Sequence, residues 1–510
     1  MCEAGYQINF KPRLSVETEY TDNLYLSDND KIYDFINVIT PGITASVLGK
    51  TRGAELSYDV GYSCYSRFSE NNGFRHRAEL NGWMGFSRRT RMNIQNSFLL
   101  TEEPGDEFEE DDEKDDDDDT HTPEKETVRR KREVYYTNTM NIGFTHQFGR
   151  TDSVSMEYIY RILENKDVTV EDKSSHKPSV NLVYWFVPER LGIETGLDWF
   201  VDESSGTPDS EGSLEKTVTP SAGIIYWIIP RQLKIAADIS YEKGKTSYDS
   251  DEPDEKYDII NPSIDVEYDY IPNKLGINST FAYKKGSSDT DESYDFTEWK
   301  GSITVTKTFT RRFEAFFQYA HTIMDFEEDS QEDYVIYDPS VGIKYIVARD
   351  VPLSFSIGYV TRDTKGKGNE SDMTINGDLG RTWNFSRYGS LNFKASSGYD
   401  ESYFGADKFG FGIFYDASVT AEYGFTKYIT GDIFGAYKRD RYTELDSVRN
   451  DETKDAGLGI TFQLINRLLS VRVGYLYREV DSTSEENSYK DSRFSIDCML
   501  SPLRPFRTVQ

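Results

Sequence analysis

Residue types that carry out catalysis are few and scattered in this chain. No GxSxG, HExxH or strand-linked GxGxxG motif is present, which argues against a nucleophile elbow, a zinc helix or a phosphate-binding loop. His321 shares a strand face with Phe317 and Tyr319, and no Ser or Asp stands beside it as a partner. We therefore expect no enzyme activity, no catalytic residue and no cofactor. The five histidines are His76, His121, His146, His176 and His321.

Carboxylates cluster in short acidic segments that could attract cations. Asp249-x-Asp251 and Asp289-x-Asp291 resemble the start of a calcium loop, but the sixth-position glycine and the closing glutamate are absent. We expect solvated charge runs and no metal site, with divalent cations bridging the acidic loops to an anionic membrane surface as the alternative.

Overall composition excludes several classes of protein. The chain has 510 residues, with 58 Lys and Arg against 89 Asp and Glu, a net charge of −31. This acidity argues against nucleic acid as a partner, because such binding needs a basic patch. The aromatic content of 14% argues against disorder. The longest apolar run, Ile224–Ile229, falls far short of the roughly 20 residues that a membrane-spanning helix needs.

Three cysteines, Cys2, Cys64 and Cys498, form no CxxC pair and indicate neither a disulfide framework nor a metal site. Met1-Cys2-Glu3-Ala4 is more typical of a trimmed start than of a secretory leader.

A short motif recurs about every 40 residues: an apolar or aromatic residue, a turn residue, and then Arg or Lys. It appears eleven times, counting a weaker copy at Gly49–Arg52, for example in Val187-Pro-Glu-Arg190, Ile229-Pro-Arg231 and Ile271-Pro-Asn-Lys274. The segments on both sides of each motif alternate strictly between apolar and polar residues. Alternation with period two predicts strands. Two strands per repeat predict a chain of hairpins.

Aromatic residues recur at a constant offset, eight residues after the first apolar residue past the turn. Eight residues of tilted strand reach roughly 20 Å, close to the apolar band of about 25 Å between the aromatic girdles of outer-membrane barrels. One girdle is predicted to contain Trp199, Tyr241, Tyr283, Tyr399, Tyr437 and Tyr477. The opposite girdle, just before the turns, is predicted to contain Phe86, Phe148, Phe186, Phe309, Phe385 and Phe425.

The pattern therefore predicts an all-β, transmembrane, antiparallel up-and-down β-barrel. Eleven short turns and twelve loops give 24 strands, with a range of 22 to 26, in one domain over 1–510, and both termini lie on the periplasmic, short-turn side. A β-propeller of the same period is the soluble alternative, but its strands would be much shorter.

One insertion interrupts the repeat. Glu102–Asp119 holds 14 carboxylates against Lys114, and like charges this dense repel one another. We expect 103–132 to be a disordered extracellular loop. The alternative is a loop that folds back and narrows the pore.

Function is expected in the lumen, which the strand faces opposite the apolar residues line. Inward side chains of both charge signs are typical of a hydrated channel. The alternative is that these side chains only form hydrogen bonds with one another across the wall. A 24-stranded barrel has a backbone diameter of roughly 45–50 Å, which is too wide for its own side chains to fill. We therefore expect the lumen to be filled by the acidic loop or by a partner protein, or to be reduced by flattening of the barrel. The pore-lining candidates are Glu194, Asp198, Lys234, Asp238, Asp265, Glu267, Lys394, Asp400, Arg472 and Arg478.

Two N-terminal segments suggest a family. Tyr20-Thr-Asp-Asn-Leu-Tyr25 followed by Ile36-Asn-Val-Ile-Thr-Pro-Gly-Ile43 resembles the outer-membrane β-barrel porins encoded with exopolysaccharide synthesis and export machinery in Gram-negative bacteria. The resemblance covers about 40 residues. It implies a channel in the bacterial outer membrane and suggests polymer export, and it brings no catalytic residues.

We therefore expect a passive conduit for a secreted polysaccharide. The partners would be outer-membrane lipid and lipopolysaccharide, the polysaccharide itself or a periplasmic export protein, and no nucleic acid. Two alternatives remain: a sheath barrel around a separate multihaem cytochrome, and a structural or adhesive surface barrel.

Overall fold

The computed structural model describes residues 6–103, 132–208, 211–249, 254–289, 295–327, 332–349, 351–366, 368–400, 412–442, 449–483 and 488–509. Most of the predicted loop at 103–132 lies outside these ranges, and only Glu103 and Arg132 at its ends are described. None of the helices in the described ranges is long and apolar enough to cross a membrane.

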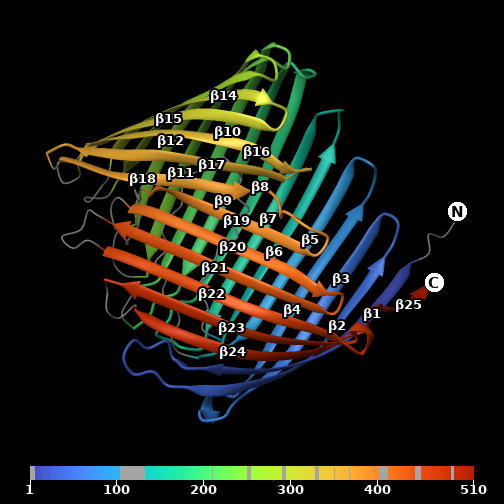
Figure 1. Cartoon of the computed structure of the whole chain (residues 1–510). Helices are drawn as coiled ribbons and strands as arrows, with labels where there is room; N and C mark the ends of the chain where they lie inside the picture. The colour runs from blue at the N-terminus through green and yellow to red at the C-terminus, as the bar shows by residue number, and fades with distance from the viewer. Residues whose placement is uncertain are drawn as a thin grey trace.

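Strands make up nearly all of the described chain, and Figure 1 shows them wrapped into one barrel. The strands are β1(Gln7–Thr21), β2(Asp34–Leu48), β3(Arg52–Tyr65), β4(Gly73–Gly85), β5(Thr90–Thr101), β6(Tyr135–Gln147), β7(Ser153–Asn165), β8(Lys173–Val187), β9(Leu191–Ser204), β10(Ser213–Ile229), β11(Leu233–Tyr248), β12(Glu255–Ile271), β13(Leu275–Ser288), β14(Phe296–Thr310), β15(Phe313–Phe326), β16(Tyr334–Ala348), β17(Val351–Thr364), β18(Gly368–Leu379), β19(Gly389–Asp400), β20(Gly412–Thr426), β21(Ile429–Tyr442), β22(Arg449–Leu464), β23(Leu469–Ser482), β24(Tyr489–Leu500) and β25(Phe506–Val509). Two short 3-10 turns are η1(Ser69–Asn71) and η2(Ile465–Arg467).

The barrel closes between its first and last long strands. Each strand pairs antiparallel with the next, and β24 returns to β1 from Leu14↔Leu500 to Thr21↔Arg493. The short β25 pairs with the start of β1 and continues the line of β24, so the wall is 24 strands around. The predicted fold class and strand number are confirmed. Both termini lie at the same end of the barrel (Figure 1).

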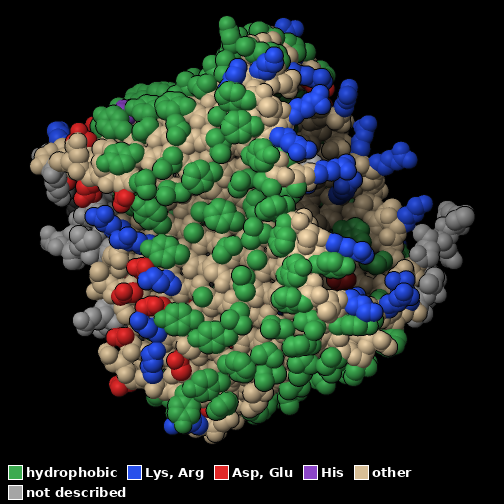
Figure 2. Space-filling model, in the orientation of Figure 1, with side chains coloured by type: hydrophobic (Ala, Val, Ile, Leu, Met, Phe, Trp, Pro, Cys, Tyr) green, Lys and Arg blue, Asp and Glu red, His purple; other side chains and the backbone are tan. Residues whose placement is uncertain are grey.

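The outer surface carries the apolar face of the alternating strands. On β12, Ile260 and Ile264 are 37% and 48% exposed, whereas Asp265 and Glu267 take the alternate, inward positions. Figure 2 shows hydrophobic side chains spread broadly over the face of the wall that is in view. Exposed apolar area on this scale requires a lipid surface.

The repeated motif forms tight turns at one end of the barrel, which we call the turn side. In three hairpins the peptide after Pro188, Pro230 or Pro272 places Glu189, Arg231 or Asn273 at φ between 57° and 59°. The next N–H donates to the carbonyl before the proline, as in Arg190 N to Val187 O at 2.9 Å. Proline followed by a residue with positive φ is the signature of a type II turn. The motif therefore fixes the turn geometry.

At the opposite end of the barrel, which we call the loop side, aspartates accept hydrogen bonds from backbone N–H groups. Asp295 accepts a hydrogen bond from the Ser288 N–H at 2.8 Å, and Asp333 accepts one from the Phe326 N–H at 3.0 Å. In both hairpins the carboxylate satisfies the backbone where the ladder ends. Part of the acidity of the loop side thus belongs to the fold.

One pair of neighbouring strands is weakly joined. Strand pairing between β18 and β19 consists of Gly377↔Ala395 and Asp378↔Lys394. Above these pairs, side chains replace the backbone ladder: the Ile375 N–H donates to Ser397 Oγ at 2.5 Å, and the Met373 N–H donates to Asp372 Oδ1 at 2.8 Å. The loop-side half of β18 therefore has a full backbone partner only in β17.

This difference predicts uneven hydrogen exchange along β18. The amides of Met373 and Ile375 face β19 and should exchange faster than those of Asp372 and Thr374, which pair toward β17, because side-chain bonds open more readily than a ladder. Amide exchange followed by NMR or mass spectrometry on the micelle-bound barrel tests this, with the fully paired β22 as the control. Equal protection at the four positions would contradict the weak junction.

Candidate functional site: the charged lumen wall

Several of the charged side chains on the lumen face form ion pairs with side chains of nearby strands. Of the predicted pore-lining residues, Lys234 and Glu267 form an ion pair at 2.8 Å, Arg472 bonds Asp432 at 2.7 Å, and Arg478 bonds Asp455 at 2.8 Å. Lys234–Glu267 and Arg478–Asp455 link adjacent strands, whereas Arg472 on β23 reaches across β22 to Asp432 on β21. Such pairing holds side chains against the wall, out of the path of a permeating molecule.

The other candidates on β9, β11, β12 and β19 occupy inward positions. Asp265 accepts a hydrogen bond from Thr280 Oγ1 at 2.6 Å, and Asp238 lies against Gly223 on the adjacent strand. A side chain at Gly223 would collide with that carboxylate, so the glycine makes room for it. Glu194 and Lys394 are exposed and Asp198 is half-buried. Asp400 ends β19, and its side chain lies outside the described part.

Five of the predicted girdle residues lie on outward strand faces. Trp199 and Tyr241 are 51% and 41% exposed. Tyr283 packs on Trp299 with ring centroids 4.4 Å apart. Tyr437 and Tyr477 share faces with the exposed Ile433 and Tyr475. The six phenylalanines that precede the turns are all exposed.

Tyr399 differs from the expectation. Its ring packs against a buried apolar cluster, and its hydroxyl lies 3.5 Å from Thr322 Oγ1. Apart from Ile413 on β20, the cluster occupies inward positions of β14 to β17, alternate to exposed residues such as Phe317. Because β19 leaves β18 above Ala395, the loop-side ends of β19 and β20 pack onto the inner wall. The cluster contains Phe296, Met324, Tyr334, Ile336, Val360 and Ile413.

A denser polar network lies next to the closure of the barrel. Arg13 on β1 donates to Asp59 Oδ1 at 2.6 Å, to Thr44 Oγ1 at 3.0 Å and to Ser57 Oγ at 2.9 Å. Arg77 and Glu79 on β4 line the same niche, which has a volume of about 190 Å³. This niche places both signs of charge on the lumen wall.

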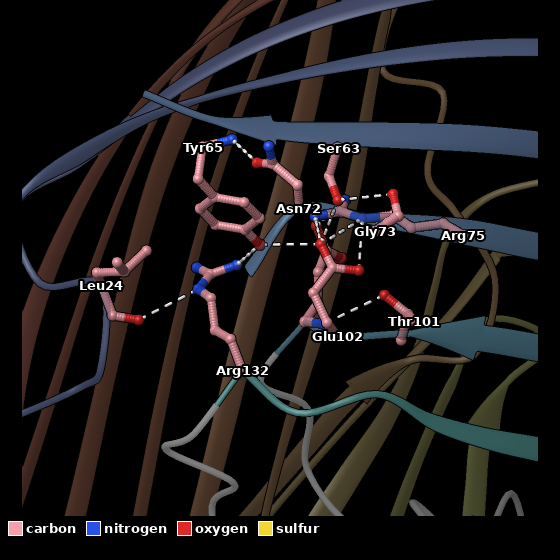
Figure 3. Close-up of polar contacts among 10 residues, drawn as sticks. Leu24, Ser63, Tyr65, Asn72, Gly73, Arg75, Thr101, Glu102 and Arg132 are labelled. Atoms are coloured by element: carbon pink, nitrogen blue, oxygen red, sulfur yellow. Dashed lines mark hydrogen bonds and ion pairs between the residues drawn. The ribbon is translucent and has the colours of Figure 1, made fainter. Parts of the chain in front are cut away.

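Glu102 is the centre of a second part of this network (Figure 3). Its side chain is 1% exposed and accepts hydrogen bonds from Ser63 Oγ at 2.7 Å, Tyr65 Oη at 2.9 Å and Arg75 Nη2 at 2.7 Å. Glu102 lies just beyond β5, outside the membrane-spanning segments. Burial opposes its ionisation, but the bonds from Arg75, Ser63 and Tyr65 outweigh burial and lower the pKa of Glu102 below its ordinary value.

Arg132 joins this network from the start of the segment that leads into β6. It is 6% exposed, donates to Tyr65 Oη at 2.9 Å and to Leu24 O at 3.2 Å, and lies over the Tyr65 ring at 5.4 Å. Glu102 and Arg132 thus meet on Tyr65, although 30 positions separate them in the sequence. Both ends of the long acidic segment are fixed to the inner side of the wall.

None of the predicted pore-lining residues belongs to this network, although β1 carries a sequence signal for part of it. On β1 the residues Arg13, Glu17 and Glu19 alternate with Leu14 and Val16, the same pattern that identified the lumen elsewhere. The contacts of Glu102 and Arg132 with Tyr65 carry no sequence signal, because they form between loops and strands distant in the chain.

The histidines in the described ranges take local partners. His76, His146 and His176 each place Nδ1 within 2.9 Å of a Tyr or Thr hydroxyl. His321 lies between the rings of Tyr319 and Tyr337, on the outward face. Among the described residues, no group of three or more His, Cys, Asp or Glu side chains is placed to hold a metal ion. His121, Asp251 and Asp291 lie outside those ranges.

These features define a closed β-barrel with an apolar outer band and a charged lumen, the class of the outer-membrane channels. A family model described as "Putative beta-barrel porin 2" matches residues 7–122 and 381–501. These two segments match that porin family, which confirms the resemblance seen at the N-terminus. Its location is the bacterial outer membrane.

Comparison with solved structures supports the fold. The siderophore receptor PirA from Pseudomonas aeruginosa has a TM-score of 0.50 and 8% identity, covering 97% of this chain and 80% of the receptor. The FrpB iron transporter from Neisseria meningitidis has a TM-score of 0.53 and 10% identity, and the match covers 96% of this chain and 81% of the transporter. The ferric-catecholate import receptor Fiu from E. coli K12 has a TM-score of 0.53 and 8% identity, and the match covers 98% of this chain and 82% of the receptor. At these identities the likeness is one of fold alone. No curated protein matches the chain.

The Glu102 network predicts an acid-sensitive part of barrel stability. Because the folded pKa of Glu102 is lowered, its stabilisation is complete above the unfolded pKa of about 4.3 and is lost as the pH falls through the folded pKa. Glu102→Gln should destabilise the barrel by about 3 kcal/mol at pH 7 and flatten the loss on acidification, because Arg75 loses a buried partner.

Denaturant unfolding in micelles at a series of pH values measures this effect. Glu79→Gln is the control, because its ion pair with Arg77 is exposed and should be worth less than about 1 kcal/mol. If both variants unfold alike at every pH, Glu102 is not the stabilising centre.

Proposed function

We propose that the barrel is a passive conduit that carries a secreted polysaccharide across the outer membrane. The single observation behind the proposal is the 24-stranded closed wall, whose backbone diameter is roughly 45–50 Å. Away from the loop-side end, which the cluster around Met324 narrows, a wall of that diameter encloses more width than ions or small solutes need. The family match supports a channel, and the N-terminal resemblance to porins encoded with polysaccharide export machinery supports the polymer.

The lining suits a hydrated polymer. Lys234–Glu267, Arg472–Asp432 and Arg478–Asp455 neutralise one another along the wall. Such compensated pairs, and hydroxyls such as that of Thr280, offer weak hydrogen bonds and no strong single site. A hydroxyl-rich chain can therefore slide along it, since conduction requires binding that is favourable but weak.

The buried cluster around Met324 and Ile336 favours an open conduit over a sheath for a protein. Tyr399 and Tyr415 already cover this cluster from the lumen side. It therefore narrows the loop-side end and leaves no bare apolar face there for a protein occupant. We further propose that the barrel transports without catalysing a reaction.

Dextran flux through proteoliposomes tests the proposal. Fluorescent dextrans of graded size, trapped inside, should leak out when the barrel is present and be retained when it is absent. A maleimide-linked polymer on Thr280→Cys, an exposed inward position, should slow the flux of the larger dextrans. The control is the same label on Lys365→Cys at the loop-side rim, with the native cysteines removed in both variants. Retention of every dextran by the intact barrel would contradict a polymer conduit.

A further inference from the structure

The two ends of the barrel differ sharply in charge. On or beside the turns lie fourteen exposed basic residues, which we call the turn-side ring: Lys50, Arg52, Arg88, Arg89, Arg150, Arg190, Arg231, Lys274, Arg311, Arg312, Arg381, Arg387, Lys427 and Arg467. Figure 2 shows these Lys and Arg side chains grouped at one end of the barrel around a hollow, whereas both signs are mixed at the other end.

In the described turns, carboxylates are fewer than the basic residues of this ring. In the described turns the acidic residues are Asp152, which accepts a bond from the Trp185 N–H, and Glu189, which lies 3.5 Å from Arg231. The loop-side lysines are different: Lys245, Lys256, Lys285 and Lys365 each pair with a carboxylate within 3.6 Å. A local excess of positive charge thus persists on a chain whose net charge is −31.

The spacing of the ring favours a long ligand. Successive turns lie two strands apart, which is about 12 Å around the rim of a tilted barrel. The screening length at 0.1 M salt is about 10 Å, so a small anion feels one turn or two. A flexible polyanion can span several turns and gain from each of them.

From these observations we propose that the turn-side ring captures a polyanionic polymer at the mouth of the barrel, and that the conducted polysaccharide therefore carries carboxylate, sulfate or phosphate groups. This inference rests on the proposed conduit and names its substrate class. The ring raises the local concentration of the acidic chain at the entrance, because a rim of one charge sign focuses oppositely charged ligands.

Equilibrium binding to the detergent-solubilised barrel tests the ring without requiring conduction. Fluorescent dextran sulfate should bind at 0.1 M salt, more weakly as salt rises, and neutral dextran of the same size should not bind. Arg150→Gln, Arg190→Gln, Arg231→Gln and Lys274→Gln together neutralise four adjacent turns. This variant should bind dextran sulfate about tenfold more weakly.

The matched control removes the same number of charges from the loop side: Lys245→Gln, Lys256→Gln, Lys285→Gln and Lys365→Gln. It should keep the wild-type affinity within about twofold. Equal losses in both variants, or no binding by the wild type, would overturn the inference. Binding to phosphatidylglycerol nanodiscs is measured in parallel. If the turn-side variant keeps its affinity for dextran sulfate and loses only its affinity for the nanodiscs, the ring binds lipid headgroups and the inference is overturned. Dextran flux is measured separately, so a barrel that passes neutral dextran but fails here retains the proposed function and loses the acidic substrate.

Discussion

Closure of the backbone ladder is the constraint on which the rest of the structure depends. In a hydrocarbon environment every backbone N–H and C=O needs a protein partner, and a closed sheet provides one for each. The pairing of β24 with β1 completes this circuit, and Thr21 adds a side-chain bond to Asp491 Oδ1 at 2.8 Å at the same junction. The junction between β18 and β19 has the fewest backbone pairs, and there the side chains of Ser397 and Asp372 accept hydrogen bonds from backbone N–H groups of β18.

Closure also separates two surfaces with different chemistry. Alternation along each strand sends apolar side chains to the lipid and charged ones to the lumen. Inside, ion pairs such as Lys234–Glu267 cancel locally, whereas the two rims remain unequal in charge. A channel built in this way has ion pairs along its wall and a difference in charge between its two ends. That combination fits a path along which a hydrated polymer enters from one side and slides without being held.

Much of this fold could be predicted because it follows from local patterns. Period-two alternation gave the strands, and the recurring motif around Pro188, Pro230 and Pro272 gave the turns, so counting turns gave 24 strands. Pairing at the closure followed from the even count. The confirmed location in the outer membrane depended on the same pattern together with the family resemblance.

Features that depend on distant contacts could not be predicted in this way. Tyr399 carries the same alternation as the girdle residues, yet it turns inward because β19 leaves β18, and nothing in its own strand signals that departure. Glu102 and Arg132 belong to a run of charge that predicts a solvated loop, and their burial comes from Tyr65, Ser63 and Arg75 on other strands. Only the three-dimensional arrangement reveals such sites.

Single-channel conductance of the purified barrel in a planar bilayer tests the central claim most directly. A hydrated lumen through a 24-stranded wall predicts steady openings in the nanosiemens range. Stable insertion without conductance would show that the lumen is closed or occupied, and it would contradict the account of the protein as an open conduit.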